Sequence, residues 1–384
     1  MNEVKKLVGE ALSEIISSAK SGGPKVKIGL MASGSELGSE ELVKGARIAL
    51  AQHENVIPVM IGPKFPGYDD LEWIEAPEGG ADIASAMEAA LKDGRIQGAV
   101  ALHFPFPLGV TTIGRVLTPA RGRDMIIAST TGTSAIQRGE AMLRNAVYGI
   151  ATAKALGNES PAIGILNVDT AQPVSRALQR MKDRGYDVNF GASARKDGGF
   201  VLRGNDILAG VVDVCVTDTL TGNVLMKMFS SFTSGGSYEM IGWGYGPSCG
   251  EGWGYVVSII SRASGAPVIA NALAYTAKVV SGRLCEKVAA EIAAAKKAGL
   301  EEEIDALTPK ASAEDEGVKA PPAEPTDEEI HGIDVLEIED AVKCLWKAGI
   351  YAESAMGCTG PVVKISKKHE GKAHGLLKQN GYII

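Results

Sequence analysis

Short apolar runs alternate with amphipathic segments along the first part of the chain. Runs of strand length occupy residues 25–33, 55–62, 98–104, 124–130, 161–168 and 210–218. Between and after them, apolar residues recur at helical spacing in segments 39–52, 141–157, 173–185 and 220–229. Strands that alternate with helices predict an α/β protein with a largely parallel sheet covered on both faces. Ligands of such sheets bind at the carboxyl ends of the strands.

The segment 234–254 interrupts this alternation with eight glycines and two tryptophans. This composition predicts an irregular loop, either a mobile loop near a binding site or a flexible surface loop. Two further helices are predicted over 266–279 and 283–298. The last part, 331–384, is predicted to hold one clear helix, a turn around Cys358, a short strand and a final helix.

Charge is concentrated in residues 301–330, which carry a net charge of −9 in a chain whose net charge is −7. An acidic segment that contains prolines is typical of a solvated linker or an interaction tail. At the start of the chain, helical spacing of apolar residues predicts an amphipathic helix docked on the body or on a partner. We therefore divide the chain into an N-terminal helix (1–24), an α/β body (25–300), an acidic linker (301–330) and a C-terminal module (331–384).

The composition argues against several classes of protein. With 45% hydrophobic and 22% charged residues, the chain can bury a sizeable core. No apolar run reaches the roughly 18 residues of a membrane span, and no basic stripe with interleaved aromatic residues indicates nucleic-acid binding. The five cysteines are scattered without a CxxC pair, and the histidines do not cluster with cysteines or acids. We expect free thiols in a reducing cytoplasm, and neither a bound metal nor a cofactor.

Three turns between a predicted strand and a predicted helix combine glycines with polar side chains. They contain, in chain order, Ser33, Gly34 and Ser35; Thr130, Thr131, Gly132 and Thr133; and Asp218, Thr221, Gly222 and Asn223, followed by Lys227 one turn into the helix. Glycines let the backbone approach a ligand, and hydroxyls with free helix N–H groups suit an anion. Helix capping without a ligand accounts for the same residues, although the recurrence of the pattern favours an anion site in the second turn. None of the turns is a Walker A or dinucleotide motif.

Cys358 lies between Gly357 and the pair Thr359–Gly360, in flexible surroundings that a cysteine in a protein core rarely needs. The residues after it include five lysines and two histidines against one glutamate. Nearby cations lower the pKa of a thiol and attract phosphate, which favours a nucleophile. A small buried cysteine before a solvated basic tail accounts for the same residues. Cys249, in the glycine-rich segment, is a second candidate for exposure.

Residues 25–280 resemble the phosphate acyltransferases that make acyl phosphates for phospholipid synthesis. The resemblance rests on the segments IGLMASGSELGSEELVKGARIAL, ASTTGTSA, PAIGILNV and DVCVTDTLTGNVLMK, which follow in the same order. It implies a two-lobed α/β fold related to phosphotransacetylase and to the isocitrate and isopropylmalate dehydrogenases. In that fold the substrate cleft lies between the lobes.

The full chain, including its acidic linker and the segment AMGCTGPVV, resembles a narrower family, the alpha subunits of component C of the glycine/sarcosine/betaine reductase complex. The resemblance implies that component B activates the substrate and that the selenocysteine of component A carries a carboxymethyl group. Component C, which also has a beta subunit, then releases acetyl phosphate in the cytoplasm of amino-acid-fermenting anaerobes. It further implies that Cys358 accepts the acetyl group as a thioester, which inorganic phosphate attacks.

We expect the three turns and Lys227 to form a pocket for phosphate and acyl phosphate, over which the module with Cys358 folds. Water must be excluded, because the thioester would otherwise hydrolyse. Two alternatives stay open. One is a free-standing phosphate acyltransferase that uses coenzyme A or acyl carrier protein. The other is a non-catalytic docking subunit for a catalytic beta partner.

Overall fold

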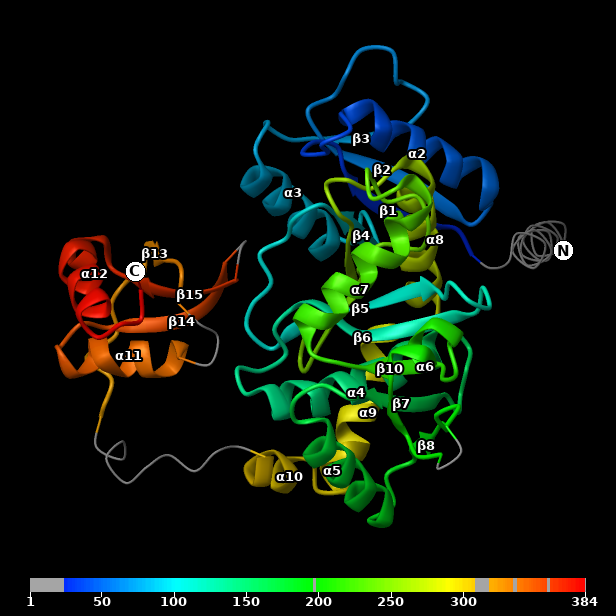
Figure 1. The fold of residues 1–384 in the computed structure, drawn as a ribbon. Helices are drawn as coiled ribbons and strands as arrows, with labels where there is room; N and C mark the ends of the chain where they lie inside the picture. The colour runs from blue at the N-terminus through cyan, green and yellow to red at the C-terminus, as the bar shows by residue number, and fades with distance from the viewer. Residues whose placement is uncertain (1–23, 196–197, 308–317, 334–336, 358–359, 384) are drawn as a thin grey trace, which may run out of the picture.

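The computed structural model describes residues 24–195, 198–307, 318–333, 337–357 and 360–383. An α/β body comes first, and the part of the chain after residue 317 forms a smaller module beside it (Figure 1). The helix predicted over 1–24 lies outside the described residues apart from Pro24, and so does Cys358.

One sheet runs through the whole body. Its described strands, in spatial order, are β3 (Glu72–Glu75), β2 (Val56–Gly62), β1 (Val26–Met31), β4 (Gly98–Ala101), β12 (Val257–Ile259), β11 (Gly246–Gly250), β5 (Val110–Leu117), β6 (Asp124–Gly132), β10 (Val214–Val216), β7 (Ala162–Leu166) and β8 (Asn189–Phe190), with β9 (Val201–Leu202) beside β7. Neighbours are parallel except in the middle, where β11 is antiparallel to β12 and β5, and β5 is antiparallel to β6. The predicted α/β class with a largely parallel sheet is confirmed.

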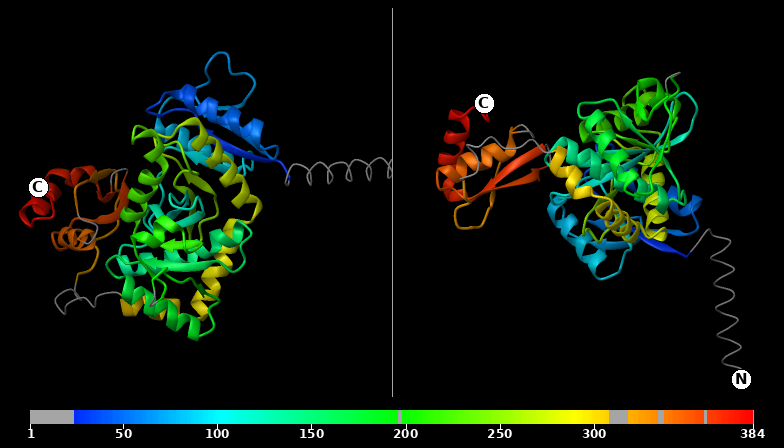
Figure 2. Two further views of the ribbon diagram at one scale, coloured as in Figure 1. Left: turned by 45° about the vertical axis from the view of Figure 1, so that its right-hand side comes forward. Right: turned by 90° about the horizontal axis from the view of Figure 1, so that it is seen from below.

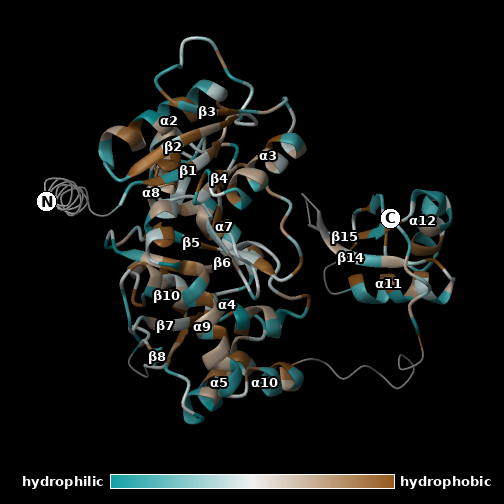
Figure 3. Ribbon diagram, turned by 180° about the vertical axis from the view of Figure 1, so that it is seen from behind, coloured by the Kyte–Doolittle hydropathy of each residue, from teal (hydrophilic) through white to brown (hydrophobic). Residues whose placement is uncertain are grey.

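Helices cover both faces of this sheet, and the two largest hydrophobic cores of the described body each join strands to helices. The helices of the body are α2 (Ser39–Gln52), α3 (Gly80–Lys92), α4 (Arg138–Ala155), α5 (Ala171–Asp183), α6 (Gly204–Ala209), α7 (Thr219–Ser231), the short η1 (Phe232–Ser234), α8 (Ala266–Ser281), α9 (Leu284–Lys297) and α10 (Leu300–Leu307). One core joins β1, β2 and β4 to α2, α3 and α8, and the other joins β6, β7 and β10 to α4, α5 and α9. Strands are mostly hydrophobic and surface helices such as α12 largely hydrophilic (Figure 3), as expected when apolar surface drives the packing.

The sequence pattern locates most elements of the body correctly. Every strand and helix predicted up to residue 229 is present, and α2 has the predicted bounds of 39–52. The helices predicted over 266–279 and 283–298 are α8 and α9. These elements carry a strong apolar periodicity, which is the signal that local sequence reports best.

The glycine-rich segment 234–254 corrects the prediction of an irregular loop. It contains β11, a fully buried strand in the middle of the sheet. Gly246 has a φ of 88°, and a Cβ built there would lie 1.8 Å from the Ile113 carbonyl oxygen. The glycine is therefore needed for a close backbone approach rather than for mobility. Cys249 lies on the same strand and is 1% exposed, so its expected exposure was wrong.

The acidic segment 301–330 begins with a helix, α10, which is fixed to the body. Glu303 is almost fully buried and forms ion pairs with Arg180 and Arg184 of the α5 region. These pairs lower the pKa of the Glu303 carboxyl, with Arg180 as the largest cause. Glu301 adds a pair with Lys296 at 3.3 Å. The tether of the C-terminal module thus starts from a helix anchored on the body.

The C-terminal module is a three-stranded antiparallel sheet with two helices. Its elements are β13 (Glu328–Ile330), α11 (Ile338–Lys347), β14 (Ala352–Gly357), β15 (Gly360–Ile365), η2 (Lys367–His369) and α12 (Glu370–Gln379), and β15 lies between β13 and β14. The end of the acidic segment therefore joins the module's sheet as β13. The module has its own hydrophobic core, and Ile136, from the body loop after β6, packs against that core.

Candidate active site

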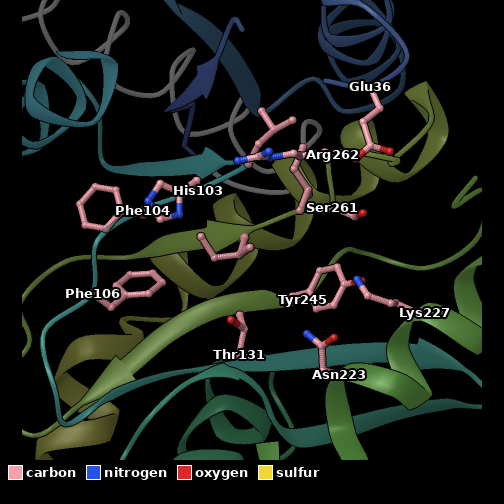
Figure 4. Close-up of a pocket in the computed structure, with 13 residues that line it drawn as sticks. Glu36, His103, Phe104, Phe106, Thr131, Asn223, Lys227, Tyr245, Ser261 and Arg262 are labelled. Atoms are coloured by element: carbon pink, nitrogen blue, oxygen red, sulfur yellow. The ribbon is translucent and has the colours of Figure 1, made fainter. Parts of the chain in front are cut away.

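A cleft of about 320 Å³ opens where several strands of the sheet end. Its lining residues are Glu36, Leu102, His103, Phe104, Phe106, Thr131, Asn223, Lys227, Tyr245, Ile259, Ile260, Ser261 and Arg262 (Figure 4). His103 follows β4 and Arg262 follows β12, and these two strands are parallel neighbours, so their carboxyl ends meet at one edge. Such an edge is the usual ligand position in an open α/β sheet.

Polar groups from β6 and α7 form the side of the cleft opposite Arg262 (Figure 4). The Asn223 side-chain amide donates a 2.9 Å hydrogen bond to the Thr130 carbonyl oxygen, which fixes the side chain at the end of β6. Lys227 lies one helical turn further, and its Nζ donates to the Tyr245 hydroxyl at 2.8 Å. An ammonium and a guanidinium on opposite walls suit an anionic ligand.

His103 adds a titratable group to the same cleft. Partial burial lowers the pKa of its imidazole, and the positive charge of Arg262 lowers it further. The neutral imidazole is therefore the main form at neutral pH. A neutral imidazole beside bound phosphate can accept or return a proton.

Behind Lys227, the cleft is backed by a buried carboxyl group. The Tyr245 hydroxyl donates to Glu239 Oε1 at 2.7 Å, and Ser264 Oγ donates to the other carboxylate oxygen at 3.3 Å. Burial raises the pKa of Glu239, against the opposing effects of the Tyr245 hydrogen bond and the Lys227 charge. Burial also raises the pKa of Tyr245, and the charge of Glu239 raises it further.

The first predicted turn, Ser33 to Ser35, supports the cleft rather than lining it. The Glu36 amide donates to the Arg262 carbonyl oxygen at 2.8 Å, and Ser35 Oγ donates to the same oxygen at 3.4 Å. Ser35 Oγ also accepts from the Leu37 amide at 3.1 Å. The turn thus holds the backbone of Arg262 in place by hydrogen bonds, while the side chain of the neighbouring Glu36 lines the cleft.

In the second predicted turn, the structure brings Thr131 alone to the cleft wall. Thr130 is fully buried, and its hydroxyl donates to the Tyr245 carbonyl oxygen at 2.6 Å. A Cβ at Gly132 would lie 2.5 Å from the Val110 carbonyl oxygen, so this glycine permits close strand packing. Thr133 exchanges backbone hydrogen bonds with Val110 and Gly109 and does not line the cleft.

The third predicted turn divides into a structural part and a ligand-facing part. Asp218 caps α7 by accepting from the Thr221 amide at 3.0 Å and from its hydroxyl at 2.6 Å. Gly222 packs against β6, where a Cβ would lie 1.8 Å from the Ser129 carbonyl oxygen. Asn223 and Lys227 face the cleft. The capping alternative is therefore correct for Asp218 and Thr221 and does not apply to Lys227.

Sequence reasoning missed His103, Arg262, Tyr245 and Glu239. His103 could have been found, because it lies near the carboxyl end of the predicted strand 98–104. Arg262 follows β12, a three-residue strand that carries too little periodicity to predict. Glu239 and Tyr245 lie in the glycine-rich segment, where no regular structure was expected.

Neither a metal cluster nor a membrane helix is found in the part of the chain that the structure describes. No group of three or more His, Cys, Asp or Glu side chains is arranged there to hold a metal ion. Among the same residues, no helix combines the length and the apolar character needed to cross a membrane.

The chain is similar to a family model and to several known proteins. Residues 26–364 match the family model described as "Fatty acid synthesis protein". The chain is 50% identical to the "Glycine/sarcosine/betaine reductase complex component C subunit alpha" of Peptoclostridium acidaminophilum, with full coverage of both chains. It is 28% identical to a phosphate acyltransferase of Thermotoga petrophila over 53% of this chain and 67% of that protein.

Among solved structures, a branched-chain phosphotransacylase from Enterococcus faecalis V583 aligns with a TM-score of 0.46 at 16% identity, covering 67% of this chain and 99% of that chain. The sequence matches span the body, the acidic segment and most of the module. The chain therefore belongs to the fatty acid synthesis protein family and, within it, to the family of component C alpha subunits of the glycine/sarcosine/betaine reductase complex.

Proposed function

We propose that the chain forms acetyl phosphate from an acetyl thioester on Cys358 and inorganic phosphate. The observation that carries the proposal is the cleft of about 320 Å³, in which Lys227 and Arg262 lie on opposite walls. Acyl-transferring relatives and a full-length component C relative support the same class of reaction.

In the proposed step, a phosphate oxygen attacks the thioester carbonyl carbon, a C–O bond forms, and the C–S bond breaks. The sulfur leaves as a thiolate and then takes up a proton. Lys227 and Arg262 balance the phosphate charge, and Asn223 and Thr131 offer hydrogen bonds from the same wall. Phe104 and Phe106 form an apolar end of the cleft that can cover the acetyl methyl group and keep water away.

In the proposal, the C-terminal module delivers the thioester. Strands β14 and β15 form a hairpin that points toward the body in the views of Figures 1 and 2. The two residues that connect Gly357 to Gly360 are Cys358 and Thr359, outside the described residues. Packing of Ile136 against the module core supports a docked module close to the turn that contributes Thr131.

Three of the basic residues after Cys358 lie beside acids from the end of the linker. Lys368 pairs with Glu324, His369 Nε2 lies 3.1 Å from the same carboxylate, and Lys367 Nζ lies 3.8 Å from Glu328. These ion pairs attach the end of the acidic linker to the C-terminal module. In the proposal, the charges that attract phosphate come from Lys227 and Arg262.

The proposal extends to the source of the acetyl group. We propose that component A, a selenoprotein with a carboxymethyl selenoether, supplies the two-carbon unit after component B has activated glycine, sarcosine or betaine. The carbon–selenium bond breaks, the methylene carbon is reduced to the acetyl methyl group, and component A is left oxidised by two electrons. A beta subunit completes component C, and the reaction takes place in the cytoplasm. Acyl exchange with coenzyme A in the absence of a selenoprotein would instead support a free-standing phosphate acyltransferase.

Selective alkylation tests the assignment of the nucleophile. Cys215 and Cys249 are buried, and burial raises the pKa of each thiol to about 12. Burial also raises the pKa of the Cys285 thiol. Iodoacetate at neutral pH is therefore expected to modify Cys358 at least about tenfold faster than these three, as peptide mass spectrometry would measure. Faster modification of Cys249 or Cys285 would move the assignment away from Cys358.

A docking role is the second candidate, and one surface of α7 favours it. Leu220, Val224 and Met228 recur every four residues and are 74%, 46% and 60% exposed, and Phe232 continues the row. An exposed apolar row of this kind marks protein interaction sites. If the beta subunit alone forms acetyl phosphate from component A as fast as the complete component C, the chain is a docking subunit. A requirement for this chain supports catalysis.

A further inference from the structure

The proposed reaction uses the Lys227 ammonium but gives no role to the buried pair Tyr245 and Glu239 behind it. These side chains are 3% and 4% exposed, and they connect a charged group of the cleft to the interior. We propose that Tyr245 and Glu239 are positioning residues that hold the Lys227 ammonium against the phosphate side of the cleft. The inference rests on the proposed function, because it concerns the same phosphate site.

The geometry forms an unbroken chain of hydrogen bonds from the cleft to the buried carboxylate. Lys227 Nζ donates to the Tyr245 hydroxyl at 2.8 Å, and that hydroxyl donates to Glu239 Oε1 at 2.7 Å. The ammonium also lies 4.9 Å from the centre of the Tyr245 ring. A lysine side chain has four flexible carbon atoms and a compact charge, so it needs such an acceptor to keep one position. The carboxylate makes the hydroxyl a better acceptor by polarising its O–H bond.

Tyr245 is itself rigidly held. Its backbone carbonyl accepts the hydroxyl of the buried Thr130, and its amide donates to the Ile259 carbonyl oxygen at 2.8 Å. Thr130 belongs to the strand that ends in the cleft, and Ile259 ends β12. The phenol therefore has a fixed position relative to both walls of the cleft.

Glu239 is fixed to the segment that carries the other cation. Its amide donates to the Ala263 carbonyl oxygen at 2.9 Å, and its own carbonyl accepts from the Gly265 amide at 2.8 Å. Ser264 Oγ donates to its carboxylate. Arg262 lies in the same short segment. One carboxylate thus links the positions of Lys227 and Arg262, the two cations on opposite walls of the cleft.

Thermal stability distinguishes a positioning role of Glu239 from a role in stabilising the fold. Lys227, Tyr245, Ser261 and Ser264 face the carboxylate, and burial outweighs them and raises its pKa. A carboxyl whose pKa is higher in the folded protein than in the unfolded chain adds stability below its ordinary pKa. That stability is lost as the pH rises through the folded pKa. At neutral pH, Glu239→Gln should therefore melt no lower than the wild type.

The test is calorimetric titration of the full chain with inorganic phosphate at neutral pH. We expect Glu239→Gln and Tyr245→Phe each to raise the Kd for phosphate about fivefold, because each removes the support of one ammonium. The double variant should resemble either single variant, because both changes act through Lys227. Lys227→Ala should raise the Kd further and make a second change at Glu239 neutral. If Tyr245→Phe folds poorly, Glu239→Gln alone carries the test, provided that thermal melting shows it to be folded.

A matched control exists elsewhere in the body. Glu291 is a buried carboxylate that accepts from Lys154 Nζ at 2.6 Å and from the Tyr186 hydroxyl at 3.1 Å, and none of the three lines the cleft. Glu291→Gln should leave phosphate binding unchanged. Wild-type phosphate affinity in Glu239→Gln, with weak binding in Lys227→Ala, would overturn this inference and leave the proposed function standing. Absence of phosphate binding to the wild type would overturn both.

Discussion

Replacement of Cys358 by alanine is expected to reduce arsenate-dependent hydrolysis of acetyl phosphate at least about a thousandfold. In this assay the thiol attacks acetyl phosphate, phosphate leaves, and arsenate attacks the resulting thioester to give an acyl arsenate that hydrolyses. An alanine methyl group cannot form the thioester, so the reaction loses its intermediate. The rate of acetate release, measured on the chain alone and with the proposed beta subunit, checks the prediction.

Cys344→Ala provides the matched control for this experiment. Cys344 lies in the same module, on α11, and is half-buried. Its replacement should leave arsenolysis close to the wild-type rate. Arsenolysis that survives in Cys358→Ala would show that another group carries the acetyl unit, or that phosphate and arsenate exchange without a covalent intermediate.

Replacement of Lys227 by alanine is expected to lower kcat/KM for phosphate about a hundredfold. Lys227 is one of two opposed cations on the cleft walls, and its ammonium is held at 2.8 Å from the Tyr245 hydroxyl. Its loss leaves Arg262 to balance the phosphate charge alone, both in the ground state and as charge shifts toward the thiolate. Steady-state rates of acetyl phosphate turnover at several phosphate concentrations measure the effect.

Lys44→Ala serves as the control for the change in net charge. Lys44 is an exposed residue of α2 that pairs with Glu41 and lies outside the lining of the cleft. Lys44→Ala should show the wild-type kcat/KM for phosphate and the wild-type dependence of kcat/KM on salt concentration. If Lys227→Ala changed kcat/KM no more than Lys44→Ala, the cleft would not be the phosphate site.

Local sequence was sufficient to predict the helices and strands that carry a clear apolar pattern of their own. The apolar spacing of 39–52 predicts α2 with its observed bounds, and Asn223 and Lys227, singled out at the start of α7, both line the cleft. Local sequence could not distinguish residues that line the cleft from residues that cap a helix. The Asp218 carboxylate and the Thr221 hydroxyl could serve either role, and in the structure they bond to each other. That distinction depends on where the helix sits relative to other strands.

The remaining cleft residues depend on tertiary packing that leaves little local signal. Gly246, directly after Tyr245, lets β11 approach Ile113 closely. Arg262 lies 35 residues after Lys227 and Glu239 lies 12 residues after it. Backbone hydrogen bonds of Glu239 with Ala263 and Gly265 hold Glu239 beside the Arg262 segment. A glycine-rich stretch can therefore be the rigid centre of a sheet, although its composition resembles that of a mobile loop.

Mapping of the acetyl group tests the central claim most directly. Component C containing the full chain would be incubated with isotopically labelled acetyl phosphate, quenched in acid and digested for peptide mass spectrometry. Labelled acetyl is expected on the peptide that contains Cys358. Neutral hydroxylamine should release this label, as expected of a thioester, and the amount of label should be strongly reduced in Lys227→Ala. Label on any other residue, or none on Cys358 while acetyl phosphate turns over, would contradict the central claim.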